Sequence, residues 1–206
     1  MARTKNFDQT EVLDRALKVF WQRGFEATSI DDLVRATGIQ RGSLYATFGN
    51  KEQLFLTALD RYWEQVAGPM MSALNDPNPR HAMRRMFESI VSRTQDSSLP
   101  RGCFFTNSAL ECPTASDRIV RRISEGMSLQ ETAIYRVLRR AQRQGALKPD
   151  QDARALARLF LAIAQGMNVV YKATGDTIIL KDIVDAAMEL WKPKESRRLA
   201  ERRSYR

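Results

Sequence analysis

The sequence contains a single histidine, His81, and two cysteines, Cys103 and Cys112. These are too few ligands for a zinc cluster and too few thiols for a disulfide scaffold, so we expect no metal and no other cofactor. No apolar run approaches the roughly 20 residues of a membrane span, and the polar start MARTKNFDQTE lacks an apolar signal segment. The sequence therefore predicts a cytoplasmic protein with no membrane partner.

The chain also lacks the patterns that catalysis requires. It has no nucleophile paired with a base, no paired carboxylates and no phosphate-binding glycine loop. We therefore expect no enzymatic activity. The formal charge of +9 favours a polyanionic partner, although more than half of the excess lies after Trp191 and does not locate a binding surface.

Apolar residues recur at helical spacing through most of the chain, and strand-like alternation is missing. The spacing predicts an all-α fold of about nine helices. The expected ranges are about 9–24, 28–38, 40–48, 50–68, 80–91, 103–111, 116–144, 152–171 and 178–191. Gly68 and Pro69 are expected to kink or end the fourth of these helices.

Helix starts are marked by residues with capping side chains. Asp8 precedes Glu11 by three residues, and Asn50 precedes Gln53 by the same distance. This spacing is typical of a capping box, in which two side chains satisfy free backbone N–H groups at a helix start. The second helix is expected to be capped by Thr28 or by Ser29.

The stretch GIQRGSLYATFGNK predicts a short helix that is weak on its own. Gly42 lies inside it and costs about 1 kcal/mol relative to alanine, so neighbouring helices must hold it in place. Leu44 and Phe48 are spaced to face those neighbours. The remaining positions face outward and carry hydrogen-bond donors without a carboxylate; they are Gln40, Arg41, Ser43, Tyr45 and Thr47.

These side-chain types have partners in the major groove of DNA. Arginine pairs with guanine, glutamine with adenine and the threonine methyl with thymine, while hydroxyl groups reach phosphates. Gly42 lets the helix backbone approach the duplex, and Thr28 and Lys51 lie at flanking helix starts, where phosphates bind. The predicted DNA-binding residues are Thr28, Gln40, Arg41, Gly42, Ser43, Tyr45, Thr47 and Lys51. The alternatives are a merely solvated face and, for Tyr45, a packing role.

The segment TSIDDLVRATGIQRGSLYATFGNKEQLF resembles the DNA-binding motif of the tetracycline-repressor family of bacterial regulators, T-x-x-x-I/L-x-x-x-A/T-G-V/I-x-x-G-x-L/F-Y-x-x-F-x-x-K-x-x-L. The resemblance implies a helix-turn-helix domain at 1–50, a ligand-sensing and dimerisation domain at 51–192 and a basic tail at 193–206. It further implies a homodimer joined through the last two helices. Such a protein binds a palindromic double-stranded DNA operator as a repressor, and a small-molecule inducer releases it.

Several aromatic and polar residues of the middle helices are candidates for the inducer pocket. They are Trp63, Phe87, Phe104, Phe105, Asn107, Glu111, Met127 and Tyr135. Apolar residues at helical spacing are also the ordinary content of a core, so the same set is open to that interpretation.

Two further functional interpretations stay open at this point. Cys103 follows Arg101 and Gly102 at an expected helix start, where a lowered thiol pKa would suit a redox or electrophile sensor, as in some members of the family. Free cysteines are otherwise small buried groups. The other alternative is a helical protein that coats DNA without sequence preference.

A stripe of small and apolar residues on the last two helices suits a four-helix seam between two copies of the chain. The candidates are Ala153, Ala157, Phe160, Ala164, Ile183, Ala187 and Leu190. Packing within one chain is the alternative for the same residues.

Overall fold

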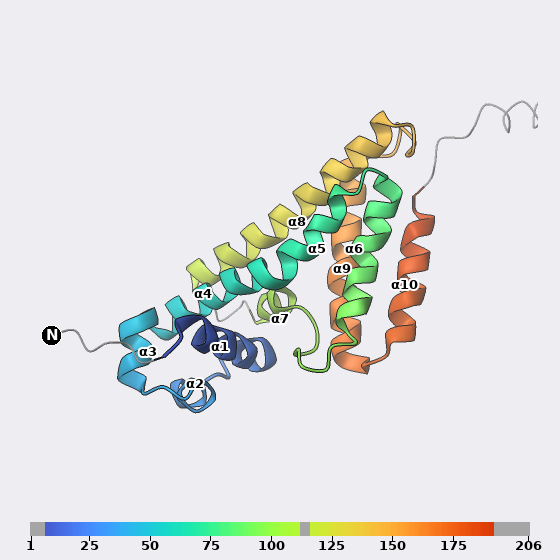
Figure 1. The fold of residues 1–206 in the computed structure, drawn as a ribbon. Helices are drawn as coiled ribbons and strands as arrows, with labels where there is room; N and C mark the ends of the chain where they lie inside the picture. The colour runs from blue at the N-terminus through green and yellow to red at the C-terminus, as the bar shows by residue number, and fades with distance from the viewer. Residues whose placement is uncertain (1–6, 112–115, 192–206) are drawn as a thin grey trace, which may run out of the picture. The chain divides into compact units, whose positions relative to one another are not determined.

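The computed structural model describes residues 7–111 and 116–191, and this part of the chain is helical without a β-strand (Figure 1). The predicted all-α fold is confirmed. The predicted basic tail, 193–206, and Cys112 lie outside the described residues. The elements in chain order are α1 (Gln9–Arg23), α2 (Ile30–Thr37), α3 (Arg41–Phe48), α4 (Lys51–Tyr62), the π-turn η1 (Trp63–Ala67), α5 (Gly68–Ser72), the 3-10 turn η2 (Ala73–Asn75), α6 (Pro79–Arg93), α7 (Phe104–Leu110), α8 (Asp117–Arg143), α9 (Ala153–Thr174) and α10 (Thr177–Glu189).

The chain forms two compact units, each with a hydrophobic core of its own. The first unit comprises Met1–Pro69 and Asp96–Met127, so it contains α1 to α4, η1, α7 and the first part of α8. The second comprises Met70–Gln95 and Ser128–Arg206, with α6, the remainder of α8, α9 and α10.

The helix starts follow the capping signals in the sequence. The Asp8 carboxylate accepts hydrogen bonds from the backbone N–H groups of Thr10 and Glu11, at 2.8 and 3.4 Å. Asn50 and Gln53 form a reciprocal capping box at the start of α4. Of the two expected caps for α2, Ser29 takes the position, so the three predicted caps are confirmed; at α1 only Asp8 caps, and the Glu11 carboxylate pairs with Arg15 rather than completing a capping box.

Aromatic side chains dominate the core of the first unit. The Phe55 ring meets Phe20 and Phe104 edge to face, with centroid distances of 5.0 and 5.2 Å. Trp21 and Tyr62 meet in the same way at 4.9 Å. Such pairs stabilise a core beyond the area that they bury, and here they join α1, α4 and α7 into one body.

The chain stays helical through Pro69, because η1 and α5 follow α4 directly, so the helical path does not end at Gly68 or Pro69, and a kink there stays a prediction. In an α-helix the proline ring would collide with the carbonyl four residues earlier, and its missing N–H would leave that carbonyl without a partner. Directly before Pro69 the helix widens into the π-turn, in which the N–H of Gly68 donates to the Trp63 carbonyl, five residues back. A Cβ at Gly68 would lie 3.1 Å from the Trp63 oxygen, which favours glycine there.

In the second unit α6, α9 and α10 run side by side (Figure 1). Phe87 of α6 meets Phe160 of α9 edge to face at 5.6 Å. After α10, the Trp191 indole N–H donates to the Ala146 carbonyl at 2.8 Å, which fastens the described end of the chain to the loop after α8.

Candidate nucleic-acid interface

The segment α2–turn–α3 has the local structure of a helix-turn-helix. Ser29 accepts from the N–H of Asp32 at 3.1 Å, and the Asp32 carboxylate accepts from the N–H of Ser29 at 3.0 Å. The Ser29 hydroxyl also donates to the Asp32 carboxylate at 2.7 Å, and this hydrogen bond, followed by the one from the Ser29 N–H, lowers the pKa of Asp32 to about 2. At the other end Gly38 ends α2 in the left-handed conformation, with φ +76°, so that only Ile39 and Gln40 separate the two helices.

Helix α3 has few stabilising interactions of its own. Gln40 is its N-cap but makes no side-chain capping hydrogen bond, and Gly42 has open space around the position of a Cβ. Leu44 is 2% exposed and anchors the helix in the core of the first unit, while Phe48 is half-buried at its end. The helix is therefore held by its neighbours rather than by its own propensity.

The outward face of α3 is polar, as the spacing predicts. Gln40, Arg41, Gly42 and Tyr45 are exposed, whereas Ser43 and Thr47 are half-buried. The Thr47 hydroxyl donates to the Ser43 carbonyl within the helix at 2.8 Å, which leaves its methyl group and its acceptor capacity for another molecule. Tyr45 is 40% exposed, which disfavours a purely packing role.

Arg41 is paired in the free protein. One of its guanidinium nitrogens lies 2.8 Å from the carboxylate of Asp31, and both side chains are more than half exposed. An exposed pair of this kind contributes about 0–1 kcal/mol, so a DNA base could replace Asp31 as the partner at small cost. The pair also keeps the guanidinium close to the surface formed by α2 and α3.

Lys51, at the first position of α4, is half-buried. Its Nζ lies over the Phe25 ring, 4.4 Å from the centroid. Burial lowers the pKa of Lys51, and the charge of Glu26 opposes that shift. The side chain is thus held beside the start of a helix, where free backbone N–H groups favour an anion.

Thr28 does not fit the predicted phosphate contact through its side chain. It is fully buried, and its hydroxyl donates to the Gly24 carbonyl at 2.6 Å. The physical reason is that Ser29 has taken the capping position, which turns the preceding side chain inward. Ser29 itself is exposed at the start of α2, and its capping spacing with Asp32 is the sequence signal that could have identified it.

The predicted apolar inducer residues are divided between the two hydrophobic cores. Phe87 and Tyr135 belong to the core of the second unit, whereas Trp63, Phe104, Phe105 and Met127 belong to the core of the first. Phe105 fills the space over Gly126, and Tyr135 stacks with Arg154 at 3.9 Å. Their positions agree with the alternative that they are ordinary core residues. Asn107 is also buried and donates to the Trp21 carbonyl at 3.2 Å.

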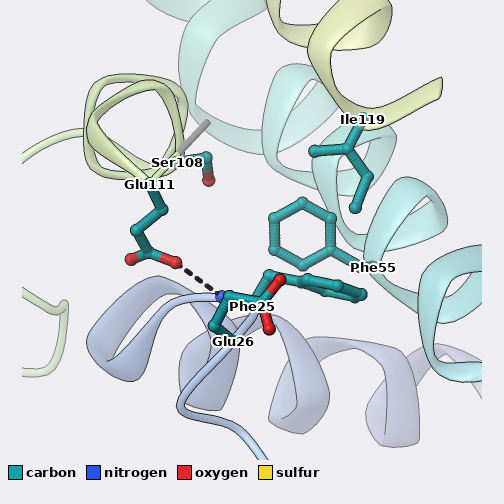
Figure 2. Close-up of a pocket in the computed structure, with 6 residues that line it drawn as sticks. All are labelled: Phe25, Glu26, Phe55, Ser108, Glu111 and Ile119. Atoms are coloured by element: carbon teal, nitrogen blue, oxygen red, sulfur yellow. Dashed lines mark hydrogen bonds between the residues drawn. The ribbon is translucent and has the colours of Figure 1, made fainter. Parts of the chain in front are cut away.

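Glu111 borders a shallow recess of the first unit (Figure 2). The recess is lined by Phe25, Glu26, Phe55, Ser108, Glu111 and Ile119. The carboxylate of Glu111 accepts a hydrogen bond from the N–H of Phe25 at 2.9 Å. Glu111 therefore binds the loop between α1 and α2, an interaction that has no signal in the local sequence.

Most of the predicted dimer residues serve the core of their own chain. Ala153, Ala157, Phe160, Ala164 and Ala187 are all at most 6% exposed and pack within the second unit. Only Ile183 and Leu190 of that set keep a half-buried or exposed position. A different stripe of α9 is uncovered, with exposed residues Ala155, Leu159, Ala162, Gly166, Val169 and Ala173.

Cys103 is buried at the N-cap of α7, where oxidants and electrophiles have little access. Its placement agrees with the alternative of a small packing residue. Within the described residues no group of three or more histidine, cysteine or acidic side chains could hold a metal ion.

Two family models match the chain. The model described as "Bacterial regulatory proteins, tetR family" matches residues 12–58, which span most of α1, all of α2 and α3, and most of α4. The model described as "Tetracyclin repressor-like, C-terminal domain" matches residues 79–187, more than half of the chain. The predicted family resemblance is confirmed.

Individual relatives cover nearly the whole chain. This chain is 34% identical over 191 residues to the HTH-type transcriptional repressor ComR of Escherichia coli K12. The alignment spans 92% of this chain and 91% of ComR. The chain is 35% identical over 192 residues to the uncharacterized HTH-type transcriptional regulator YezE of Bacillus subtilis 168, spanning 92% and 99% of the two chains.

A solved structure extends the likeness to a DNA complex. A cysteine mutant of the TetR family transcriptional regulator CifR, complexed with a 26-bp double-strand operator DNA, superposes with a TM-score of 0.85 at 29% identity, covering 93% of this chain and 100% of that chain. These relatives are transcriptional regulators and not enzymes, as the sequence predicts for this chain. The chain belongs to the tetracycline-repressor family and is a helix-turn-helix DNA-binding transcriptional regulator.

Proposed function

We propose that this regulator binds a palindromic operator as a homodimer, represses transcription in the cytoplasm and leaves the DNA when a small molecule binds. The observation that carries the proposal is the outward face of α3. It combines exposed hydrogen-bond donors, no carboxylate and a glycine with open space around it. A helix with such a face fits the major groove of DNA.

Each residue of the proposed interface has a role that follows from its chemistry. Arg41 reads guanine once it leaves Asp31, and Gln40 reads adenine. The Thr47 methyl group meets thymine. Ser43 and Tyr45 bind phosphates through their hydroxyl groups, and the Lys51 ammonium binds one by charge.

The relatives support the operator and the repressor role. CifR is seen with a duplex of 26 bp, which is about two and a half helical turns. A duplex of this length offers two successive major grooves on one side, one for each reading helix of a symmetric dimer. ComR is named a repressor, which favours the same direction of control here.

The uncovered stripe of α9 supports a dimer of this chain. Helix α9 is long and apolar enough to cross a membrane by length and composition, yet it packs beside α6 and α10, and 39% of its most apolar window is buried within the chain. The exposed stripe contains small residues, with Gly166 at its centre and open space around it. A twin helix of a second copy fits because small residues allow close approach and the interface of a two-fold dimer is self-complementary.

The dimer is tested by charging the stripe. We expect the double substitution Leu159→Glu and Val169→Glu to give a monomer in sedimentation velocity and to weaken operator binding. Leu129→Glu on α8 is the matched control, because Leu129 is 53% exposed and Leu159 is 45% exposed, but Leu129 lies outside the α9 stripe. A double mutant that stays dimeric refutes this interface.

Release by a small molecule requires polar groups that a ligand can bind and a segment that can move. Two buried donors of the first unit, the Trp21 indole N–H and the Ser108 hydroxyl, have no hydrogen-bond partner in the described part of the chain. A ligand that satisfies such groups gains binding energy. The π-turn before Pro69 marks a helix segment whose backbone hydrogen bonds can rearrange locally. A rearrangement there that changes the distance between the two reading helices of a dimer would release DNA.

The decisive experiment selects bound fragments from random DNA with the full-length protein. We expect a palindromic sequence, bound tighter than random DNA by ~10³ or more at moderate salt. A protein that coats DNA without preference would enrich no sequence and would lose all binding steeply with salt. Compounds that raise the unfolding temperature are then added to the selected complex, and failure of every such compound to lower the affinity contradicts release.

A further inference from the structure

A carboxylate at the end of α7 fixes the loop between α1 and α2. Glu111 accepts a hydrogen bond from the N–H of Phe25 at 2.9 Å, across 86 positions of sequence (Figure 2). The neighbouring Gly24 has φ +84°, and a Cβ on it would lie 1.9 Å from a Glu111 carboxylate oxygen. The carboxylate thus fills the space that any side chain at Gly24 would need, so the loop conformation and the position of Glu111 depend on each other.

The same loop holds the starts of the two helices that flank the reading helix. The Gly24 carbonyl accepts the Thr28 hydroxyl at 2.6 Å, directly before the cap of α2. The Phe25 ring lies beneath the ammonium group of Lys51, the first residue of α4. The pair Gly24–Phe25, here called the node, therefore connects Glu111, directly after α7, with the starts of α2 and α4.

The contact between α7 and this node includes a polar group that is left unsatisfied. The Ser108 side chain is 4% exposed and lines the same recess as Glu111, and its hydroxyl has no hydrogen-bond partner among the described residues (Figure 2). A buried hydroxyl without a partner destabilises the arrangement that buries it. A rearrangement that exposes this hydroxyl to water would recover part of that cost.

We propose that Glu111 is a positioning residue for DNA binding, and that displacement of α7 weakens the DNA interface by withdrawing this carboxylate from the Gly24–Phe25 node. The inference rests on the proposed function, because it needs DNA as the partner of α3. When Glu111 withdraws, the N–H of Phe25 loses its acceptor and the loop relaxes. The starts of α2 and α4 then lose their fixed spacing, which α3 needs in order to fit the groove.

The test measures one amide and one affinity in the full-length protein. We expect Glu111→Ala to raise the hydrogen-exchange rate of the Phe25 amide and to weaken binding to the selected duplex by about tenfold, as the loss of one hydrogen bond to a charged acceptor predicts. Glu111→Gln keeps an acceptor oxygen and should stay close to the wild type in both measurements. Glu111→Asp, one methylene shorter, should behave like the alanine variant and serves if that variant folds poorly.

Asp60→Ala is the matched control, because it removes the carboxylate that accepts from Arg122 at 2.7 Å, a bond of the first unit that does not involve the node. It should leave the Phe25 amide and the affinity unchanged. Equal losses in Asp60→Ala and Glu111→Ala overturn the proposal, as does a Glu111→Ala protein with wild-type exchange and affinity. Wild-type protein that selects no duplex refutes the proposed function itself, while the exchange rate of Phe25 still reports on the contact.

Discussion

Replacing Gly42 should separate the stability of the protein from its affinity for DNA. Gly42 is exposed at the second position of α3, and a Cβ built on it meets no heavy atom within 4 Å. Alanine at a helical position is favoured over glycine by about 0.5–1 kcal/mol. For a domain of this size a gain of that order raises the unfolding temperature by about 2 °C. Gly42→Ala is therefore expected to be slightly more stable than the wild type.

The same methyl group should weaken operator binding. If the α3 backbone approaches the duplex at Gly42, the added carbon occupies space that the DNA needs, and we expect a loss on the order of tenfold, or about 1.4 kcal/mol. Gly42→Leu extends the series, because leucine is also a good helix former but is much larger. Its affinity should fall further while the fold stays stable, since the free protein has open space at this position.

Thermal unfolding by circular dichroism and fluorescence anisotropy with the selected duplex measure the two effects. The opposite signs are the essential result, because a variant that merely damaged the fold would lose stability and affinity together. A Gly42→Leu protein that binds the duplex as tightly as the wild type would show that α3 does not approach DNA at this residue, and the proposed docking of α3 would have to be abandoned.

Three further predictions concern the charges around this helix. Lys51→Met should weaken binding to all DNA sequences alike and make the negative slope of log affinity against log salt concentration less steep by about 0.9, as the loss of one phosphate contact requires. An unchanged slope in salt titrations would exclude Lys51 from the interface. Asp31→Asn should change the free energy of unfolding by no more than about 1 kcal/mol but raise DNA affinity, because it frees Arg41 and removes a negative charge; a weaker complex would mean that Asp31 orients Arg41 for binding. The pKa of Asp32 is lowered to about 2 from an ordinary 3.8. The ionised Asp32 side chain therefore stabilises the fold fully above about pH 4, and this stabilisation is lost as the pH falls through about 2. In urea unfolding between about pH 2 and 5, the free energy of unfolding should depend less on pH for Asp32→Asn than for the wild type.

The features predicted correctly are those encoded by neighbouring residues. Asp8, Ser29 and Asn50 cap helices because a short oxygen-bearing side chain reaches the N–H groups two or three positions later. The turn between α2 and α3 follows from Gly38 for a similar reason. Local chemistry of this kind needs no knowledge of the rest of the fold, so the short helix α3 and its outward residues could be identified from sequence.

The α9 stripe that we propose for the dimer could not be identified in this way, because both sides of α9 are apolar. Ala153, Ala157 and Ala164 form one stripe at helical spacing, and Ala155, Ala162 and Gly166 form another. Periodicity reports that a stripe exists but not which neighbour covers it. The structure shows that the first stripe packs inside the second unit, because α6 and α10 pack against this helix.

Glu111 illustrates a second limit of sequence reasoning. Its carboxylate was expected to anchor an inducer, yet it accepts the N–H of Phe25, 86 positions away. A hydrogen bond between such distant residues is set by the packing of α7 against α1, which no spacing rule contains. This kind of contact also has mechanical importance, because α3 has no side-chain cap and is anchored mainly through Leu44. A helix that takes its stability from its neighbours changes its position when they move, so we expect a displacement of α7 within the first unit to shift α3 as a whole while its own helical structure stays the same.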